Sequence, residues 1–301
     1  MQSDFLTHFE AYLLTQKRMA RNTVLAYMQD LQQFACFLQQ VGCPLDALSE
    51  QIIQEFLYTL KKGHALQARS MSRKISSLKV FFTYLHQQHG FADLTLNLQF
   101  PKLEKRLPNF LTEKEVEALL RCAREDTTLL GKRNTMVLLL LYSTGIRISE
   151  AMQLKISGIR FDTGFITVFG KGSKERLIPL AQPVLKELSS FLNEVHPKLL
   201  PKQTGAVDFL FPVLYKKEIK AMTRQAAWAI VKTMARKAGI ERHLSPHTLR
   251  HSLATHLLEK GANLRLLQVW LGHENLSTVE IYTHINTNHL RKMYDKKHPR
   301  S

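Results

Sequence analysis

The fold is decided by the stretch SPHTLRHSLATHLLEKGANLRLLQVWLGHENLSTVEIYTH, residues 245–284. Ser245 is a good N-cap and Pro246 suits the first helical position, so together they predict the start of a helix. His247 and Arg250 lie three residues apart on one face of its first turns. Free N–H groups and the positive end of the helix dipole favour an anion there. The pair therefore indicates a site for a phosphate or a carboxylate.

A second helix is predicted from the Asn263 cap to Gly272, a residue type that commonly follows a helix end, so His273 falls on a turn. Ser277 begins a third helix with an S-x-x-E capping box, which places Tyr282 about one and a half turns into it. In an unbroken helix, roughly 2.5 turns would separate His273 from Tyr282 and put them on opposite faces. The interruption instead lets the two side chains converge.

Each of these residues also has an ordinary structural interpretation. A His and an Arg at a helix start are most often a surface capping interaction. Tyr282, between Val279 and Ile285 at helical spacing, would usually be a core aromatic with its hydroxyl at the rim. No single residue of the set decides between a structural and a functional role.

The composition indicates a globular protein of two domains with a polyanionic partner. The chain has 301 residues, 45% of them hydrophobic, which is long for one domain and sufficient for two cores. Lys and Arg total 42 against 25 Asp and Glu, and the formal net charge of +17 favours nucleic acid over an acidic membrane surface. The longest apolar run, residues 136–142, is far below the roughly 20 residues that span a bilayer. With no signal peptide evident, we expect a cytoplasmic protein without a membrane partner.

Residues 1–90 predict a small helical domain with a basic end. Asn22 with Thr23 is expected to cap its second helix. Near the start of the fourth helix, Arg69, Arg73 and Lys74 form either a solvated face or a set of phosphate contacts. The expected helices are Phe5–Gln16, Thr23–Gln40, Glu50–Lys62 and Leu66–Gln88. The expected buried face of the second helix comprises Leu25, Met28, Leu31, Phe34, Ala35 and Leu38.

Residues 91–111 lose helical periodicity and are expected to link this domain to a second one, residues 112–301, whose first helix Thr112 caps. Alternation and turn residues in 159–181 predict a small three-stranded antiparallel sheet, with Lys171 in its second turn. This GKGSK stretch is not a P-loop, because Gly172 stands where a Ser or Thr is required. Two basic domains joined by a basic linker suggest a clamp closed round a duplex, and an ordinary exposed linker is equally compatible with this sequence.

Two further groups in the second domain are candidates for function. Arg147 lies near the start of a helix and Glu150 follows three residues on, which fits an i, i+3 surface pair as well as a functional one. Thr223 is expected to open a later helix, with Arg224 and Gln225 exposed in its first turn as DNA contacts. These spacings alone leave both interpretations open.

Taken together, six residues in a fixed order resemble the tyrosine recombinase, or phage integrase, family: Arg147, Lys171, His247, Arg250, His273 and Tyr282. The motifs that carry the resemblance are TGIRISE, GKGSKERLIPL, SPHTLRHSLATHLL, LGHENLST and IYTH. The likeness covers nearly the whole chain and is closest to the bacterial Xer site-specific recombinases. It implies a mainly α protein, with a four-helix core-binding domain and a catalytic domain that ends in a helix exchanged between subunits.

By this resemblance, Tyr282 is the nucleophile, and its attack on a DNA phosphate leaves a 3′-phosphotyrosyl link. Negative charge builds up on the non-bridging oxygens at phosphorus, and donors already in place stabilise it. Arg147 and Arg250 suit that task, because planar guanidinium groups bind phosphate bidentately. Glu150 is a candidate for orienting Arg147.

The resemblance further implies that Lys171 protonates the departing 5′-oxygen, that His247 assists as acid/base partner and that His273 donates a hydrogen bond. Because the covalent link retains the phosphodiester bond energy, strand exchange needs no ATP, metal or other cofactor. Four subunits, identical or including a paralogue, would pair two specific double-stranded DNA sites and exchange strands through a Holliday junction. A septal DNA translocase is a candidate activator, and resolution of chromosome or plasmid multimers is the favoured role.

Several other functions remain as alternatives. An integrase or invertase of a mobile element is the nearest, followed by a type IB topoisomerase, which uses the same chemistry to relax a single duplex. A DNA-binding protein without catalysis would not need Tyr282 or Lys171. A zinc enzyme is suggested by His247 and His251, with His243 and His256 near. However, the first His is not followed by Glu as in H-E-x-x-H. The cysteines, which form no C-x-x-C pair, argue against a disulfide framework or zinc knuckle: Cys36, Cys43 and Cys122.

Overall fold

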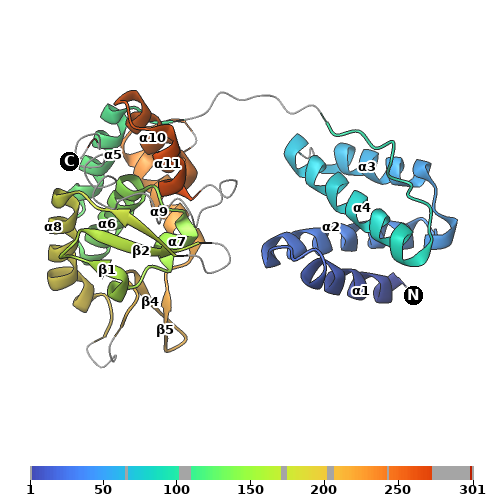
Figure 1. Ribbon diagram of the computed structural model, residues 1–301, viewed down its shortest axis with the longest axis horizontal. Helices are drawn as coiled ribbons and strands as arrows, with labels where there is room; N and C mark the ends of the chain where they lie inside the picture. The colour runs from blue at the N-terminus through green and yellow to red at the C-terminus, as the bar shows by residue number, and fades with distance from the viewer. Residues whose placement is uncertain are drawn as a thin grey trace. The chain divides into compact units, whose positions relative to one another are not determined.

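Two compact units, Met1–Arg106 and Leu107–Ser301, make up the chain in the computed structural model (Figure 1). The structure describes residues 2–64, 67–101, 110–170, 175–201, 207–242, 244–272 and 299. The boundary between the units falls within the expected linker, residues 91–111. Each unit has a hydrophobic core of its own and is described by itself.

The first unit is built from four helices, as the sequence predicts. They are α1 (Gln2–Thr15), α2 (Arg21–Gln40), α3 (Glu50–His64) and α4 (Ala68–His89), with a 3-10 turn at Leu45–Ala47. α2 packs against both α1 and α4. Large apolar side chains from all four helices fill the core, among them Phe9, Leu31, Ile53, Leu78 and Leu85.

Two details of the first unit differ from the prediction. α2 begins at Arg21 after an Ala20 N-cap that makes no side-chain hydrogen bond, so the predicted cap at Asn22 and Thr23 is wrong. Leu25 is 56% exposed, and its neighbour Val24 is buried instead. The buried face of α2 is therefore the face that α1 and α4 cover. Leu25 lies one position further round the helix and falls outside that face.

The expected linker is packed at both of its described ends. Phe91, Leu94 and Leu98 lie on the first hydrophobic core, so the first unit continues beyond α4. Leu111 is fully buried in the second core, and its backbone N–H donates to the Ser252 hydroxyl at 2.8 Å. Each unit thus anchors the chain on its own side.

In the second unit, helices surround a central helix, α6 (Leu129–Thr144), whose residues from Met136 to Tyr142 are all buried (Figure 1). This explains why that run of sequence is apolar all round rather than on one face. α5 and α10 pack on α6. The other helices are α5 (Glu113–Glu125), α7 (Ile148–Met152), α8 (Gln182–Ser190), α9 (Arg224–Lys237), α10 (Pro246–Glu259) and α11 (Leu264–Leu271). Short helical turns occur at Ile156–Gly158, Phe191–Val195 and His196–Lys198.

The predicted three-stranded antiparallel sheet is confirmed. It consists of β1 (Ile159–Arg160), β2 (Phe165–Phe169) and β3 (Glu175–Pro179) in that order. Ile166 pairs with Ile178, both fully buried, and Val168 pairs with Arg176 on the same inward face. A second hairpin, which was not predicted from the sequence, pairs β4 (Pro212–Tyr215) with β5 (Glu218–Ala221).

Helix ends in the second unit follow the predicted capping residues. Thr112 forms a capping box with Glu115. Ser245 caps α10, with Pro246 at its start. The Asn263 side chain caps α11, which ends at Gly272 in the left-handed region (φ 69°). The third predicted helix, from Ser277, lies outside the described residues.

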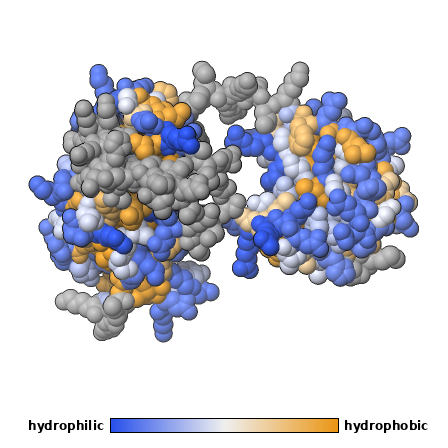
Figure 2. Space-filling model, in the orientation of Figure 1, coloured by the Kyte–Doolittle hydropathy of each residue, from blue (hydrophilic) through white to orange (hydrophobic). Residues whose placement is uncertain are grey.

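The visible face of each unit is largely hydrophilic, with separate hydrophobic patches (Figure 2). Within the described ranges, no helix is long and apolar enough to cross a membrane. Nor do three or more His, Cys, Asp or Glu side chains in the described part of the chain come together as candidate metal ligands. The three cysteines are unpaired.

Candidate active site

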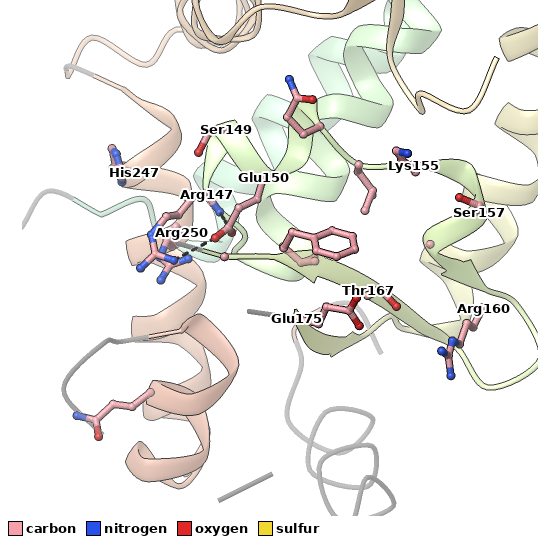
Figure 3. Close-up of a pocket in the computed structure, with 17 residues that line it drawn as sticks. Arg147, Ser149, Glu150, Lys155, Ser157, Arg160, Thr167, Glu175, His247 and Arg250 are labelled. Carbon is pink, nitrogen blue, oxygen red and sulfur yellow. Dashed lines mark hydrogen bonds and ion pairs between the residues drawn. The ribbon is translucent and has the colours of Figure 1, made fainter. Parts of the chain in front are cut away.

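An open groove of about 1590 Å³ in the second unit brings together the described residues of the predicted catalytic set. Figure 3 shows Arg147, His247 and Arg250 at one end of the groove, and Lys155, Ser157 and Arg160 at the other. The groove is lined by four Lys and Arg side chains and one His, against the two carboxylates Glu150 and Glu175. Such a surface suits a polyanion.

Arg147 and Glu150 form an ion pair in which the carboxylate is buried and the arginine side chain is 37% exposed. Arg147 directly precedes α7; its backbone N–H donates to Glu150 Oε2 at 2.9 Å and its Nη1 to Oε1 at 3.1 Å. Glu150 is only 9% exposed. Burial alone would raise the pKa of Glu150, but hydrogen bonds and charge from Arg176, with further hydrogen bonds from Arg147, hold that pKa below its usual range. Glu150 is therefore an anion at neutral pH, and it fixes the direction of the Arg147 side chain.

Arg250 projects from α10 toward the same place. Its Nη1 donates to Gly145 O at 2.7 Å and its Nη2 to Leu271 O. Burial, followed by repulsion from Arg147 and Arg176, lowers the pKa of Arg250 to about 10, although Glu150 opposes the shift. The guanidinium is thus protonated at neutral pH but carries a charge that its surroundings compensate poorly. An anionic ligand would relieve this, as expected of a phosphate site.

The end of α11 is the common anchor of the site. The last carbonyls of a helix lack partners within it and lie at the negative end of its dipole, so they attract cations. Three consecutive carbonyls each accept from a different arginine: Trp270 from Arg176 at 3.2 Å, Leu271 from Arg250, and Gly272 from Arg147 at 2.8 Å. The end of α11 therefore positions Arg147 and Arg250, the two arginines at one end of the groove.

At Gly145, a residue next to the site, there is no room for a side chain. It ends α6 with φ 63°, and a Cβ there would lie 2.8 Å from Leu271 Cδ2 and 2.9 Å from Leu253 Cδ2. Both leucines are buried and have little room to move. We expect Gly145→Ala to lower the free energy of unfolding by about 2–4 kcal/mol, from left-handed strain and from overpacking.

Urea denaturation followed by tryptophan fluorescence will measure this loss, because Trp228 and Trp270, the two tryptophans of the chain, both lie in the second unit. Gly239→Ala is the matched control, since Gly239 has φ 69° in the same unit but nothing within 4 Å of its Cβ position. The control should lose only about 1–2 kcal/mol. Equal losses in both variants would show that packing at Gly145 is unimportant.

Of the remaining predicted catalytic residues, the structure describes only His247. His247 is exposed on the groove, near the start of α10. Lys171, His273 and Tyr282 lie outside the described residues. The last described residues before two of these gaps belong to the site, because Gly170 lines the groove and Gly272 accepts from Arg147.

The candidate DNA contacts of the first unit are not equivalent. Arg69 is exposed, whereas Arg73 is partly exposed and donates to Asp30 at 2.6 Å. The Lys74 side chain is 6% exposed and its ammonium group donates to Asp30 at 2.8 Å and to Gln33. Lys74 is therefore corrected to a structural residue, because its charge is neutralised in the interior and is not offered to a phosphate.

In the second unit the candidates at the start of α9 are all exposed. Thr223 caps the helix, accepting from the Ala226 N–H at 3.1 Å, so its hydroxyl is partly committed. Arg224 and Gln225 follow in the first turn, as predicted. Their side chains are accessible to a ligand.

Sequence reasoning missed Arg176, Lys155 and Arg160. Arg176 is inside the quoted GKGSKERLIPL motif and shares its strand face with buried Ile178, so a charge at an inward position was the available signal. Lys155 and Arg160 flank short turns without periodicity. Nothing in their spacing distinguishes them from ordinary surface residues.

Comparison with known proteins agrees with this architecture. Residues 109–289 match the phage integrase family, and residues 6–89 match the phage integrase N-terminal SAM-like domain. The chain is 38% identical over 296 residues to the tyrosine recombinase XerD of Staphylococcus epidermidis, covering 96% of this chain and 97% of the relative. The XerD of Staphylococcus haemolyticus is 39% identical over 292 residues, with the same coverage.

Solved structures give the same result. The XerH site-specific recombinase bound to its difH substrate in a pre-cleavage complex has a TM-score of 0.67 and 27% identity, over 89% of this chain and 78% of that one. A lambda integrase dimer bound to a COC′ core site shares the fold, with a TM-score of 0.67 at 17% identity over 90% and 94% of the two chains. The chain therefore belongs to the phage integrase family of tyrosine recombinases and is an enzyme of site-specific DNA recombination.

Proposed function

We propose that this enzyme cuts one strand of a specific double-stranded DNA site by attack of the Tyr282 hydroxyl on phosphorus. The bond from phosphorus to the 5′-oxygen breaks as the 3′-phosphotyrosyl bond forms. His247 takes the tyrosine proton, Lys171 gives a proton to the leaving 5′-oxygen, and His273 donates a hydrogen bond to the phosphate. The reverse reaction, with a 5′-hydroxyl from another duplex, rejoins the strands. Since one phosphodiester replaces another, no ATP is required.

The observation that carries this proposal is the pair of guanidinium groups held at one end of the groove. Arg147 and Arg250 are anchored on adjacent carbonyls at the end of α11. Arg250 uses Nη1 and Nη2 for its two carbonyls, but each of these nitrogens has a second N–H to offer a phosphate oxygen. With Arg176 and Glu150 included, three positive charges face one negative charge. This excess suits the charge that develops at phosphorus in the transition state.

We further propose how the enzyme holds its DNA and its partners. Arg69, Arg73, Arg224 and Gln225, with Thr223, are candidate backbone contacts. Four subunits, alone or with a paralogue, pair two sites in the cytoplasm, with a septal DNA translocase as a candidate activator. The relatives named XerD and the XerH complex with difH support resolution of chromosome or plasmid multimers over a mobile-element role.

Product topology tests this function. Plasmids carry one or two directly repeated copies of the site, which is identified by sequencing DNA recovered covalently attached to the protein. Purified protein is supplemented with extract of host cells that lack it, so that any partner recombinase is present. We expect two-copy plasmids to yield two circles, and one-copy plasmids to relax no further than in the extract without the protein. Additional relaxation of one-copy plasmids would instead identify a topoisomerase. DNA binding without either product would identify a binding protein without catalysis.

A further inference from the structure

Arg176 is a buried cation to which the proposed chemistry assigns no direct step. It lies on β3 with its side chain 7% exposed. Its Nη1 and Nη2 donate to the two oxygens of Glu150 at 3.0 and 2.6 Å, and its Nε donates to Trp270 O at 3.2 Å. One guanidinium therefore joins the sheet to α7 and to the end of α11.

Glu150 is shared between two arginines. Each of its oxygens accepts from Arg176 and also from Arg147, whose contacts are 2.9 and 3.1 Å long. The bidentate contact from Arg176 leaves the carboxylate one orientation, which is the one that binds Arg147. If Arg176 were removed, Glu150 would be a buried anion held only by its two hydrogen bonds from Arg147.

The second contact of Arg176, from its Nε, is with the end of α11. Gly272 lies directly against the guanidinium, since a Cβ at that residue would be 3.3 Å from Arg176 Cζ and Nε. Trp270, whose carbonyl accepts from Arg176, also donates its indole N–H to Thr144 O at 3.0 Å. Arg176 thus helps to hold the turn of α11 whose next two carbonyls anchor Arg250 and Arg147.

A purely structural role explains this arrangement poorly. A buried Arg–Glu pair contributes little net stability compared with apolar residues of the same volume, because both charges must be desolvated. Here Arg176 also places a third positive charge beside Arg147 and Arg250, which lowers the pKa of Arg250, although Glu150 of the same pair opposes that shift. An electropositive phosphate site benefits from that charge, whereas a hydrophobic core does not.

We propose that Arg176 is a positioning residue for strand cleavage, which holds Glu150 and the end of α11 so that Arg147 and Arg250 meet the scissile phosphate. This inference rests on the proposed roles of those two arginines. It also ties β3, which begins four residues after Lys171, to the same point. The Arg176 side chain therefore joins β3, α7 and the end of α11, and each of these segments contains or adjoins a proposed catalytic residue.

The test compares single-turnover cleavage of two substrates, one with an ordinary scissile phosphodiester and one with a neutral methylphosphonate at that position. We expect Arg176→Met to slow cleavage of the phosphodiester by about 100-fold, the effect of small misplacement of catalytic groups, without changing DNA affinity. On the methylphosphonate, where there is no phosphate charge to stabilise, most of the difference from wild type should disappear. Arg176→Lys, which keeps the charge and one donor direction, should recover part of the loss.

Arg124→Met is the matched control, because it removes an Arg–Glu contact of 2.7 Å, to Glu187, elsewhere in the same unit. An equal defect of Arg176→Met on both substrates, or wild-type cleavage by it, would overturn the inference. If Arg176→Met does not fold, the same substrate comparison with Arg176→Lys decides. Absence of cleavage by the wild type would be a failure of the proposed function instead.

Discussion

Replacing Tyr282 with phenylalanine is expected to abolish covalent attachment of the protein to DNA while leaving DNA binding intact. The substitution removes one oxygen atom, which the proposed mechanism uses as nucleophile, and none of the cations that attract the duplex. The measurement is recovery of protein–DNA adducts that survive denaturation of host cells, followed by sequencing of the attached DNA. Wild-type adducts should map to one recurrent site, which also identifies the target.

Tyr294→Phe is the matched control, because it removes the same atom twelve residues further along the chain. It should form adducts as the wild type does. Equal adducts from wild type and Tyr282→Phe would assign the nucleophile to another residue. No adduct from the wild type under trapping conditions, despite tight DNA binding, would remove catalysis from the proposal and favour the binding-only alternative.

Features set by local chemistry were predictable from the sequence. The boundaries of α10 and α11 follow from Ser245, Asn263 and Gly272, since caps depend on residues within a few positions of one another. The three-stranded sheet follows from alternation and turn residues in the same way. The set of catalytic residues could be predicted only from the family resemblance, because local patterns do not relate residues that lie far apart in the sequence.

Features set by contacts between distant segments were not predictable. Lys74 has the spacing of a surface lysine, and only Asp30, 44 residues away, makes it a buried partner. Arg176 likewise meets Glu150 across 26 residues and Trp270 across 94. Leu25 is the converse case, an apolar residue predicted to be buried that stays exposed because no neighbouring element covers it. In each case the tertiary partner decides, and spacing along one helix or strand does not reveal it.

Arg250→Lys is expected to lower the single-turnover cleavage rate by about 100–1000-fold, with a much smaller effect on DNA affinity. A lysine keeps a positive charge but is a single point of donation. It cannot donate to Gly145 O, to Leu271 O and to two phosphate oxygens at once. Arg265→Lys is the matched control, since Arg265 is exposed near the start of α11 and does not line the groove. A loss in Arg250→Lys no larger than in this control would show that charge alone suffices.

The same variant should also acquire a dependence on pH that the wild type lacks. Burial and the charges of Arg147 and Arg176 lower the pKa of Arg250 to about 10, which leaves the guanidinium charged throughout the physiological range. A lysine ordinarily titrates at about 10.4, and burial with the same neighbouring charges would bring its pKa to a lower value. Because the charged form is the active one, cleavage by Arg250→Lys should fall as the pH rises through that value, while the wild-type rate does not fall in the same window. If the wild type and Arg250→Lys gave parallel profiles of cleavage rate against pH, the bound phosphate would already compensate the repulsion among the arginines. The site would then be preorganised by its ligand rather than by the fold.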